Sequence, residues 1–293
     1  MKINELKQDL AAAFRWTARL NMNEGIANHF SVCLPNSNDF YVNGSGLHFS
    51  SIKASDMVLV EQDKIDEIKK KPELVDPTAL HIHGTIHKKV PQARCILHVH
   101  SKYATALSAL KNPVLQPIDQ NTMRFYNRVS IYNDFGGLGF EDESNKMASA
   151  IGNNRSLLLA NHGILTLGQT VAEAFDELYY FEKACETYLT ALSTNKELNI
   201  VSSEVADSYF NSRPRGSQIG AWSSNQSEEL ISRSELIDKI KKSETKYADQ
   251  NIPRPLHWNG YLVKPKLIEF WQEMPFSCLL YTSDAADDSL RVD

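Results

Sequence analysis

The chain has 293 residues, of which 42% are hydrophobic and 23% charged, and its formal net charge is −5. That length is enough for one large hydrophobic core or two smaller ones. The sequence has no long basic run and no stretch near the ~20 apolar residues of a membrane span. Both features argue against nucleic acid or a membrane as the main partner.

The pattern of apolar residues then predicts alternating helices and strands over the first two thirds of the chain. Predicted helices cover residues 4–20, 76–89, 101–110 and 170–194, and predicted strands cover 29–34, 40–44, 57–61 and 94–100, with two more inside 156–168. Strands interleaved with helices predict one layered α/β domain.

The texture of the sequence changes after Leu198. Residues 212–227 are polar and rich in Gly and Ser, 227–250 form a charged predicted helix, and 254–272 carry two predicted aromatic strands. We do not expect this short segment to complete a hydrophobic core by itself.

Two further features bear on the cellular compartment. The opening residues, MKINELKQDL, lack the basic-then-apolar layout of a secretory signal. Cys33, Cys95, Cys185 and Cys278 are scattered and form no CxxC pair, as expected for free thiols in a reducing compartment. We therefore expect a cytoplasmic protein.

Three histidines form the strongest candidate site. His98 and His100 lie two positions apart in the predicted strand ILHVH, so their side chains point to the same face. His162 lies in an Asn-His-Gly corner, where the glycine lets the backbone turn and present the ring. Three neutral imidazoles from two strands would form an N3 metal site with open coordination positions, as in catalytic zinc sites; the alternative is a chance pair on a strand.

The motifs ILHVHS, LLLANHGIL, TVAEAF, LNMNEGIANHFSV and NGSGLHFSSIKASDMVLV resemble the class II aldolase/adducin N-terminal family from about residue 4 to about 200. The resemblance implies an α/β/α fold over residues 1–200, a homo-oligomer (a tetramer in most members) and a small-molecule substrate. It also implies a divalent cation, typically zinc, with manganese or iron as alternatives, bound by His98, His100 and His162. Such an ion would polarise a substrate carbonyl and stabilise an enediolate formed by C–C cleavage.

The sequence departs from the family at one position of the helix 76–89. Sugar-phosphate aldolases of the family carry a glutamate, which serves as ligand and proton shuttle, where this chain has Ala79. His83 and His87 share a face of that helix, so one of them could supply a fourth ligand or a catalytic base; the alternative is ordinary core or surface histidines. The missing acid favours a decarboxylase-like enzyme, or a non-catalytic adducin-like member, over the usual aldol cleavage.

The resemblance also implies an anion pocket for the substrate. Its residues here would be Asn28, Ser45, Gly46 and Thr78. Hydroxyls and backbone N–H groups near a glycine turn suit a phosphate or carboxylate. Ala27 replaces the usual glycine before Asn28, so the pocket is expected to differ from that of the sugar-phosphate enzymes.

Residues 201–277 resemble a second family, the C-terminal part of pyridoxamine 5′-phosphate oxidase, a dimeric split β-barrel that uses FMN. The motifs are SYFNSRPRGSQIGAWSSNQS and IEFWQ. The resemblance implies substrate-phosphate contacts from Tyr209, Arg213 and Ser217, and FMN contacts from Gln226, Ser227 and Trp271. Most of that family's FMN-binding strands are missing, so we expect an incomplete split-barrel fragment without oxidase activity.

Residues 278–293 form a tail that resembles neither family. Its first ten residues, CLLYTSDAAD, match the translation of a sequencing adapter, so we expect the tail to be disordered and exclude it from the fold. We interpret the whole chain as a chimera of an aldolase-like domain, an oxidase fragment and adapter; a natural fusion is the alternative. The leading function is a metal-dependent lyase, with a non-catalytic adducin-like module and an FMN oxidase as the alternatives.

Overall fold

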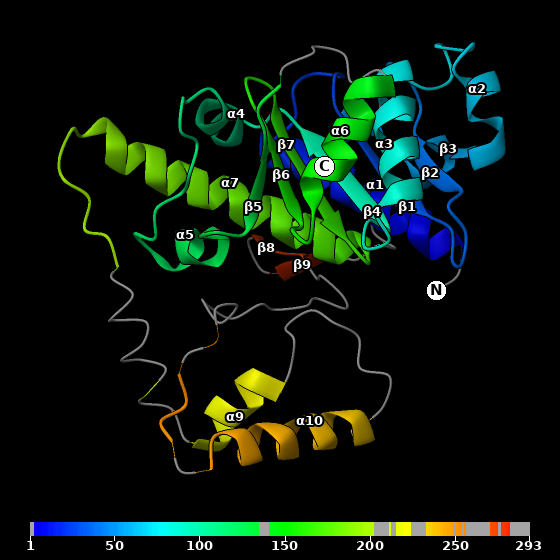
Figure 1. Cartoon of the computed structure of the whole chain (residues 1–293). Helices are drawn as coiled ribbons and strands as arrows, with labels where there is room; N and C mark the ends of the chain where they lie inside the picture. Colours follow the sequence, from blue (N-terminus) through cyan, green and yellow to red (C-terminus); the bar gives the residue numbers. More distant parts are fainter. Residues whose placement is uncertain are drawn as a thin grey trace.

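A computed structural model describes residues 3–134, 141–201, 211, 215–223, 233–248, 250–253, 255, 270–274 and 277–281 (Figure 1). Every structural statement below concerns these residues. Among them, no helix has both the length and the apolar character needed to cross a membrane. Cys33, Cys95 and Cys185 are buried free thiols, as the scattered spacing predicted.

A seven-stranded mixed sheet organises the first two thirds of the chain, with the order β3-β2-β1-β4-β7-β6-β5. Its strands are β1 (His29–Cys33), β2 (Phe40–Asn43), β3 (Met57–Val60), β4 (Cys95–Val99), β5 (Val129–Tyr132), β6 (Ser156–Leu159) and β7 (Gly163–Gly168). Neighbouring strands are antiparallel except β5 and β6, which are parallel. β4 lies between β1 and β7, so His98 has a residue of each strand beside it: His29 of β1 and Leu165 of β7.

Helices cover both faces of this sheet (Figure 1). One face packs against α1 (Ile3–Arg19), α4 (Lys102–Ser108), α5 (Gln120–Phe125) and α7 (Val171–Ser193). The other face packs against α3 (Pro77–Lys89) and α6 (Glu141–Ile151). Short 3₁₀ turns (Phe49–Ser51 and Ala54–Asp56) connect β2 to β3, and a third (Gln62–Lys64) with α2 (Ile65–Ile68) connects β3 to α3. The predicted three-layer α/β/α architecture is confirmed.

Alternation along β4 explains why both faces are covered. Cys95, Leu97 and Val99 join the hydrophobic cluster under α1 and α7, while Ile96 joins the cluster under α3 and α6. Successive strand residues point to opposite faces, so His98 shares the α3 side of the sheet with Ile96. The His98 side chain therefore lies on the face of the sheet that α3 and α6 cover.

The segment between residues 111 and 155 was not assigned from the sequence and contains α5, β5 and α6. β5 is an edge strand, and three of its four residues are only partly buried, so its apolar pattern is weak. α5 is six residues long and begins with a capping box from Asp119 and Thr122. Such short elements are stabilised by tertiary packing more than by local propensity.

The described part of the C-terminal third contains two helices and a strand pair. α9 (Arg215–Ser223) and α10 (Arg233–Lys246) share a small cluster of Ile219, Ala221, Tyr247 and Ile252. The charged helix predicted over 227–250 is confirmed as the shorter α10. The polar stretch containing α9 was not expected to be helical.

β8 (Phe270–Met274) pairs with β9 (Ser277–Tyr281), antiparallel. β8 confirms one of the two predicted aromatic strands; the segment for the other lies outside the described residues. β9 includes residues 278–281 of the tail, where disorder was expected. In those four residues an apolar run, CLLY, is long enough to form a short strand once a partner is present.

A buried carboxylate fixes the chain just beyond β4. Glu182 of α7 accepts hydrogen bonds from Ser101 Oγ (2.6 Å), Tyr103 N–H (2.9 Å) and Ala104 N–H (2.9 Å). These donors are at the N-terminus of α4, where backbone N–H groups lack helical partners and a negative charge is favourable. The contact ties the residues that follow His100 to the long helix α7.

Replacing Glu182 with alanine is therefore expected to lower the free energy of unfolding by roughly 3 kcal/mol, because buried donors lose a charged acceptor. Urea denaturation followed by circular dichroism measures this loss. Glu186→Ala is the matched control on the same helix: its ion pair with Lys183 is solvent-exposed, and removal costs about 0–1 kcal/mol. Equal urea midpoints for the two variants would contradict the capping role.

Candidate metal centre

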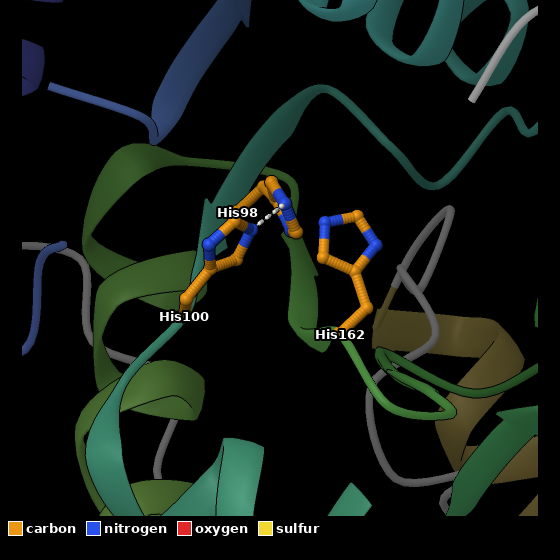
Figure 2. A group of neighbouring side chains, drawn as sticks. All are labelled: His98, His100 and His162. Atoms are coloured by element: carbon orange, nitrogen blue, oxygen red, sulfur yellow. Dashed lines mark hydrogen bonds between the residues drawn. The ribbon is translucent and has the colours of Figure 1, made fainter. Parts of the chain in front are cut away.

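The three predicted histidines come together at one end of β4 (Figure 2). His98 is in β4, and His100 is the residue directly after the strand end. His162 is in the tight turn between β6 and β7. Figure 2 shows its ring facing the other two from this turn.

The turn that carries His162 depends on its two flanking residues. Asn161 has a φ of 57°, in the left-handed region that asparagine tolerates better than most residues. A methyl group at Gly163 would overlap the backbone carbonyl oxygen of Val99. Only glycine therefore allows the turn to approach the end of β4 so closely.

The rings are close enough to share one ion. Ring centroids are 4.9 Å apart for His98 and His162, 4.6 Å for His100 and His162, and 4.9 Å for His98 and His100. One nitrogen from each ring lies within 4.8 Å of the others. His98 is buried, and the other two are partly buried. The three side chains could hold a divalent metal ion.

Hydrogen bonds orient two of these rings for that purpose. His98 Nδ1 lies 3.0 Å from the carbonyl oxygen of Ile164, and His100 Nδ1 lies 2.6 Å from Glu24 Oε2. Both partners only accept hydrogen bonds, so each Nδ1 carries a proton, and in the neutral ring Nε2 has the lone pair that a metal ion needs. Metal-ligating histidines commonly make this second contact.

The two Nε2 atoms lie 3.1 Å apart. Two lone pairs that close repel unless a proton or a cation lies between them. Two imidazoles on one tetrahedral zinc, with Zn–N bonds of about 2.0–2.1 Å, place their nitrogens about 3.3 Å apart. The spacing in this structure therefore fits a shared metal ion.

Burial keeps the rings of His98 and His162 neutral, as metal ligands must be. Desolvation lowers the pKa of His98 well below its ordinary value of 6.5, and neighbouring His29, His162 and His100 lower it further. Burial and His100 lower the pKa of His162 to about 4. At neutral pH these nitrogens carry lone pairs rather than protons, so they compete for a cation without first losing a proton.

His29, on β1, is the residue at this site that sequence reasoning missed. It pairs with His98 across the β1–β4 ladder, and the two ring centroids are 4.9 Å apart. Burial lowers its pKa to about 4, against the opposing effect of the Asp76 carboxylate. The available signal was the alternation of His29 and Ser31 in HFSVC, which places both on one face of a strand, like His98 and His100.

The predicted fourth ligand or base, His83 or His87, does not offer a free nitrogen in this structure. His83 Nε2 lies 2.6 Å from His29 Nδ1, and its Nδ1 contacts Ser31 Oγ. His87 Nε2 lies 2.7 Å from Ser31 Oγ, and its Nδ1 lies 2.6 Å from the carbonyl oxygen of Ala93. Both histidines share the buried face of α3, as their spacing indicated, but they connect to the centre through His29.

The predicted anion-pocket residues are only partly brought together. Ser45 N–H donates to the carbonyl oxygen of Leu74 (3.0 Å), and Thr78 N–H donates to Asp76 Oδ1 (2.7 Å), so Ser45 lies near the start of α3. Gly46 has a φ of 75°. The described hydrogen bonds do not join these residues to Asn28.

Asn28 lies instead beside the histidines. Its Oδ1 accepts a hydrogen bond from Glu24 N–H (2.7 Å), and the carboxylate of Glu24 holds His100. Asn28 is 1% exposed, and its Nδ2 has no hydrogen-bond partner among the described residues. A buried amide donor without a partner is costly, which indicates that a ligand or water satisfies it.

Of the residues assigned to FMN and pyridoxal phosphate by resemblance, Tyr209, Arg213, Gln226 and Ser227 lie outside the described residues. Ser217 is in α9, and Trp271 is in β8.

A layered α/β/α fold with three converging histidines defines a class of possible metal-binding proteins. Comparison with known proteins shows which family has these features. The sequence model of the Class II Aldolase and Adducin N-terminal domain matches residues 8–216. The chain belongs to this family.

Two curated relatives and one solved structure illustrate the family. The chain is 36% identical over 191 residues to the meiotically up-regulated gene 14 protein of Schizosaccharomyces pombe (64% of this chain and 73% of the relative). It is 30% identical over 224 residues to the decarboxylase NovR of Streptomyces niveus (75% and 81%). The L-fuculose 1-phosphate aldolase from Glaciozyma antarctica superposes with a TM-score of 0.61 at 25% identity (86% and 92%).

The C-terminal region is similar to a different family. It is 55% identical over 76 residues to the pyridoxine/pyridoxamine 5′-phosphate oxidase of Cytophaga hutchinsonii, covering 26% of this chain and 35% of the oxidase. The chain therefore spans only about a third of that oxidase. The division of the chain at residues 200 and 277 remains a prediction.

Proposed function

We propose that the protein is a metal-dependent lyase that cleaves a C–C bond, by an aldol or decarboxylation route, in a small hydroxy-carbonyl substrate. The observation that carries the proposal is the convergence of His98 Nε2 and His100 Nε2 at 3.1 Å, with both Nδ1 atoms held by acceptors. Zinc fits the donor set best, and manganese or iron also accept imidazole ligands. The family includes both an aldolase and a decarboxylase by name, which supports this reaction class.

The chain's own residues perform the binding and orientation. The Ile164 carbonyl and the Glu24 carboxylate fix the ring planes of His98 and His100. When bound, the ion would polarise the substrate carbonyl and stabilise the enediolate charge, because three neutral ligands leave its full charge in place. The free Nδ2–H of Asn28 would donate to a substrate oxygen, which supports the prediction that Asn28 is a substrate contact.

The choice between the two reaction types follows from Ala79. This position is buried against Val75 and Leu80 in an apolar cluster, and it has no carboxylate to shuttle a proton. Decarboxylation leaves a carbanion of the same kind without first deprotonating a hydroxyl group. We favour decarboxylation of a β-keto acid that carries a hydroxyl group on its α-carbon, because the electron pair left by CO₂ then passes onto the carbonyl as an enediolate; aldol cleavage is the second possibility.

The test combines metal analysis with a substrate screen on the full chain. We expect about one zinc, manganese or iron ion per chain, and metal-dependent release of CO₂ or an aldehyde from a panel of hydroxy acids and sugar phosphates. Chelation should abolish the reaction, and re-addition of one metal should restore it. A folded protein that binds no metal would instead be a non-catalytic adducin-like module.

The remaining expectations come from the two resemblances. We propose a cytoplasmic homo-oligomer, a tetramer as in most of the family, and no FMN oxidase activity. A yellow protein with bound FMN would contradict the last point. Amplification from source DNA across the codons for residues 190–215 tests the chimera hypothesis; an intact product would show a natural fusion.

A further inference from the structure

A buried chain of side chains leads from the backbone of α3's C-terminal loop to the metal centre. It runs from the Ala93 carbonyl oxygen to His87 (2.6 Å), then to Ser31 (2.7 Å), His83 and His29 (2.6 Å). His29, Ser31, His83 and His87 are 4% exposed or less. The proposed reaction makes no use of His83, Ser31 or His87.

The direction of every hydrogen bond in this network follows from its Ala93 end when each ring is neutral. A carbonyl oxygen only accepts, so His87 carries its proton on Nδ1 and offers a lone pair at Nε2. Ser31 must then donate its hydroxyl proton to His87 Nε2 and accept from His83 Nδ1. His83 Nε2 is left with a lone pair, which accepts from His29 Nδ1–H.

This assignment requires neutral imidazoles, and the surroundings favour them. Burial lowers the pKa of His87 to about 3 and that of His83 well below 6.5. A charged ring at either position would lie in an apolar layer with no carboxylate in hydrogen-bond contact, at high desolvation cost. Each ring therefore holds one proton, and the chain has one consistent arrangement.

The last nitrogen in this series of hydrogen-bonded side chains is His29 Nε2. This atom lies across the ring from Nδ1, so it points away from His83 and α3. The ring lies beside that of His98, with ring centroids 4.9 Å apart, and the two residues pair across the β1–β4 ladder. It is not a member of the group whose nitrogens lie within 4.8 Å of one another.

We propose that the chain Ala93–His87–Ser31–His83 is a positioning device that holds His29 as the Nδ1–H tautomer, with the Nε2 lone pair facing the substrate bound at the metal centre. His29 then accepts a hydrogen bond from a substrate hydroxyl group. The inference rests on the proposed function, since it assigns a substrate-facing role at that site.

The tautomers can be read directly in the metal-free full-length protein. Long-range ¹H–¹⁵N correlation spectra of ¹⁵N-histidine-labelled protein show which ring nitrogen is protonated. We expect Nδ1–H forms for His29, His83 and His87 at neutral pH. Detection of His29 protonated at Nε2, or of His83 protonated at both nitrogens, would overturn the assignment.

Ser31→Ala breaks the chain in its middle. His83 then loses the acceptor for Nδ1–H and can move its proton to Nε2, which would shift His29 to the Nε2–H form. Ser31→Thr keeps the hydroxyl group and should keep the wild-type tautomers. Ser156→Ala is the matched control, because Ser156 is an equally buried strand serine that donates to Glu177 (2.7 Å) and contacts no histidine. A Ser31→Ala spectrum identical to wild type would contradict the positioning role.

A zinc titration separates a substrate-facing His29 from a fourth metal ligand. We expect His29→Gln to bind zinc as tightly as wild type, whereas loss of a ligand weakens binding about a hundredfold. Weakening of that size would overturn the substrate-facing role. If wild-type protein binds none of zinc, manganese and iron, the proposed function fails, but the metal-free spectra still decide whether these hydrogen bonds set the tautomer of His29.

Discussion

Replacing His98 with alanine is expected to remove the bound metal ion from the purified protein. His98 is the buried member of the three histidines, and β4 contains no second histidine that could replace it as a metal ligand. Zinc sites with four ligands are worth roughly 10–16 kcal/mol, or about 3 kcal/mol for each ligand, so one lost imidazole weakens binding about a hundredfold. Any metal-dependent activity should fall with it.

Elemental analysis after dialysis, together with competition against a chromogenic chelator, measures the change. His48→Ala is the control, because His48 is exposed and caps the turn Phe49–Ser51, outside the three-histidine group. It should retain its metal ion. A His98→Ala protein with wild-type metal content and circular dichroism would show that the ion, if present, is bound elsewhere.

Acidification should destabilise the metal-free protein steeply below pH 6.5. The pKa values of His29 and His162 are lowered to about 4 and that of His87 to about 3, mainly by burial. In this window the unfolded chain binds protons that the folded chain excludes, so stability is complete above pH 6.5 and is lost as pH falls toward these values. Each histidine contributes up to about 1.4 kcal/mol per pH unit.

Urea unfolding of metal-free protein at several pH values between 6.5 and 5 gives the slope. The slope should be shallower for His87→Phe, by up to one proton, because that variant lacks one of the neutral buried rings. Ser156→Ala should lower stability equally at every pH and leave the slope unchanged. Stability that is flat across this range would mean that the buried rings already accept protons in the folded protein.

The parts of the site that the sequence predicted are those that local pattern determines. The HxH repeat places His98 and His100 on one side of a strand, and the Asn-His-Gly corner presents His162 from a turn. The strands and long helices followed in the same way from their periodicity. Within residues 111–155, α5 and β5 did not, because both are short and depend on packing.

His29 could not be found in this way, since its role depends on strand order. β1 and β4 are far apart in the sequence, and only the order of strands in the folded sheet makes them neighbours. The roles of His83 and His87 depended on the same fact: α3 packs over β1 and presents both rings to Ser31, which lies more than fifty positions away in the sequence. Pairwise contacts of this range leave no periodic mark on the sequence.

The separation of the two sheet faces has a consequence for altering this protein. His29, Ser31 and His98 point toward α3, while Phe30, Val32 and Leu97, on the same two strands, point into the large cluster under α1 and α7. Protein engineers could therefore vary the polar positions on the α3-facing side of β1 and β4 in search of new substrates, leaving the core residues Cys33 and Ile96 in place. The hydrophobic cluster under α1 and α7 would remain intact, because each position on these strands faces only one side of the sheet.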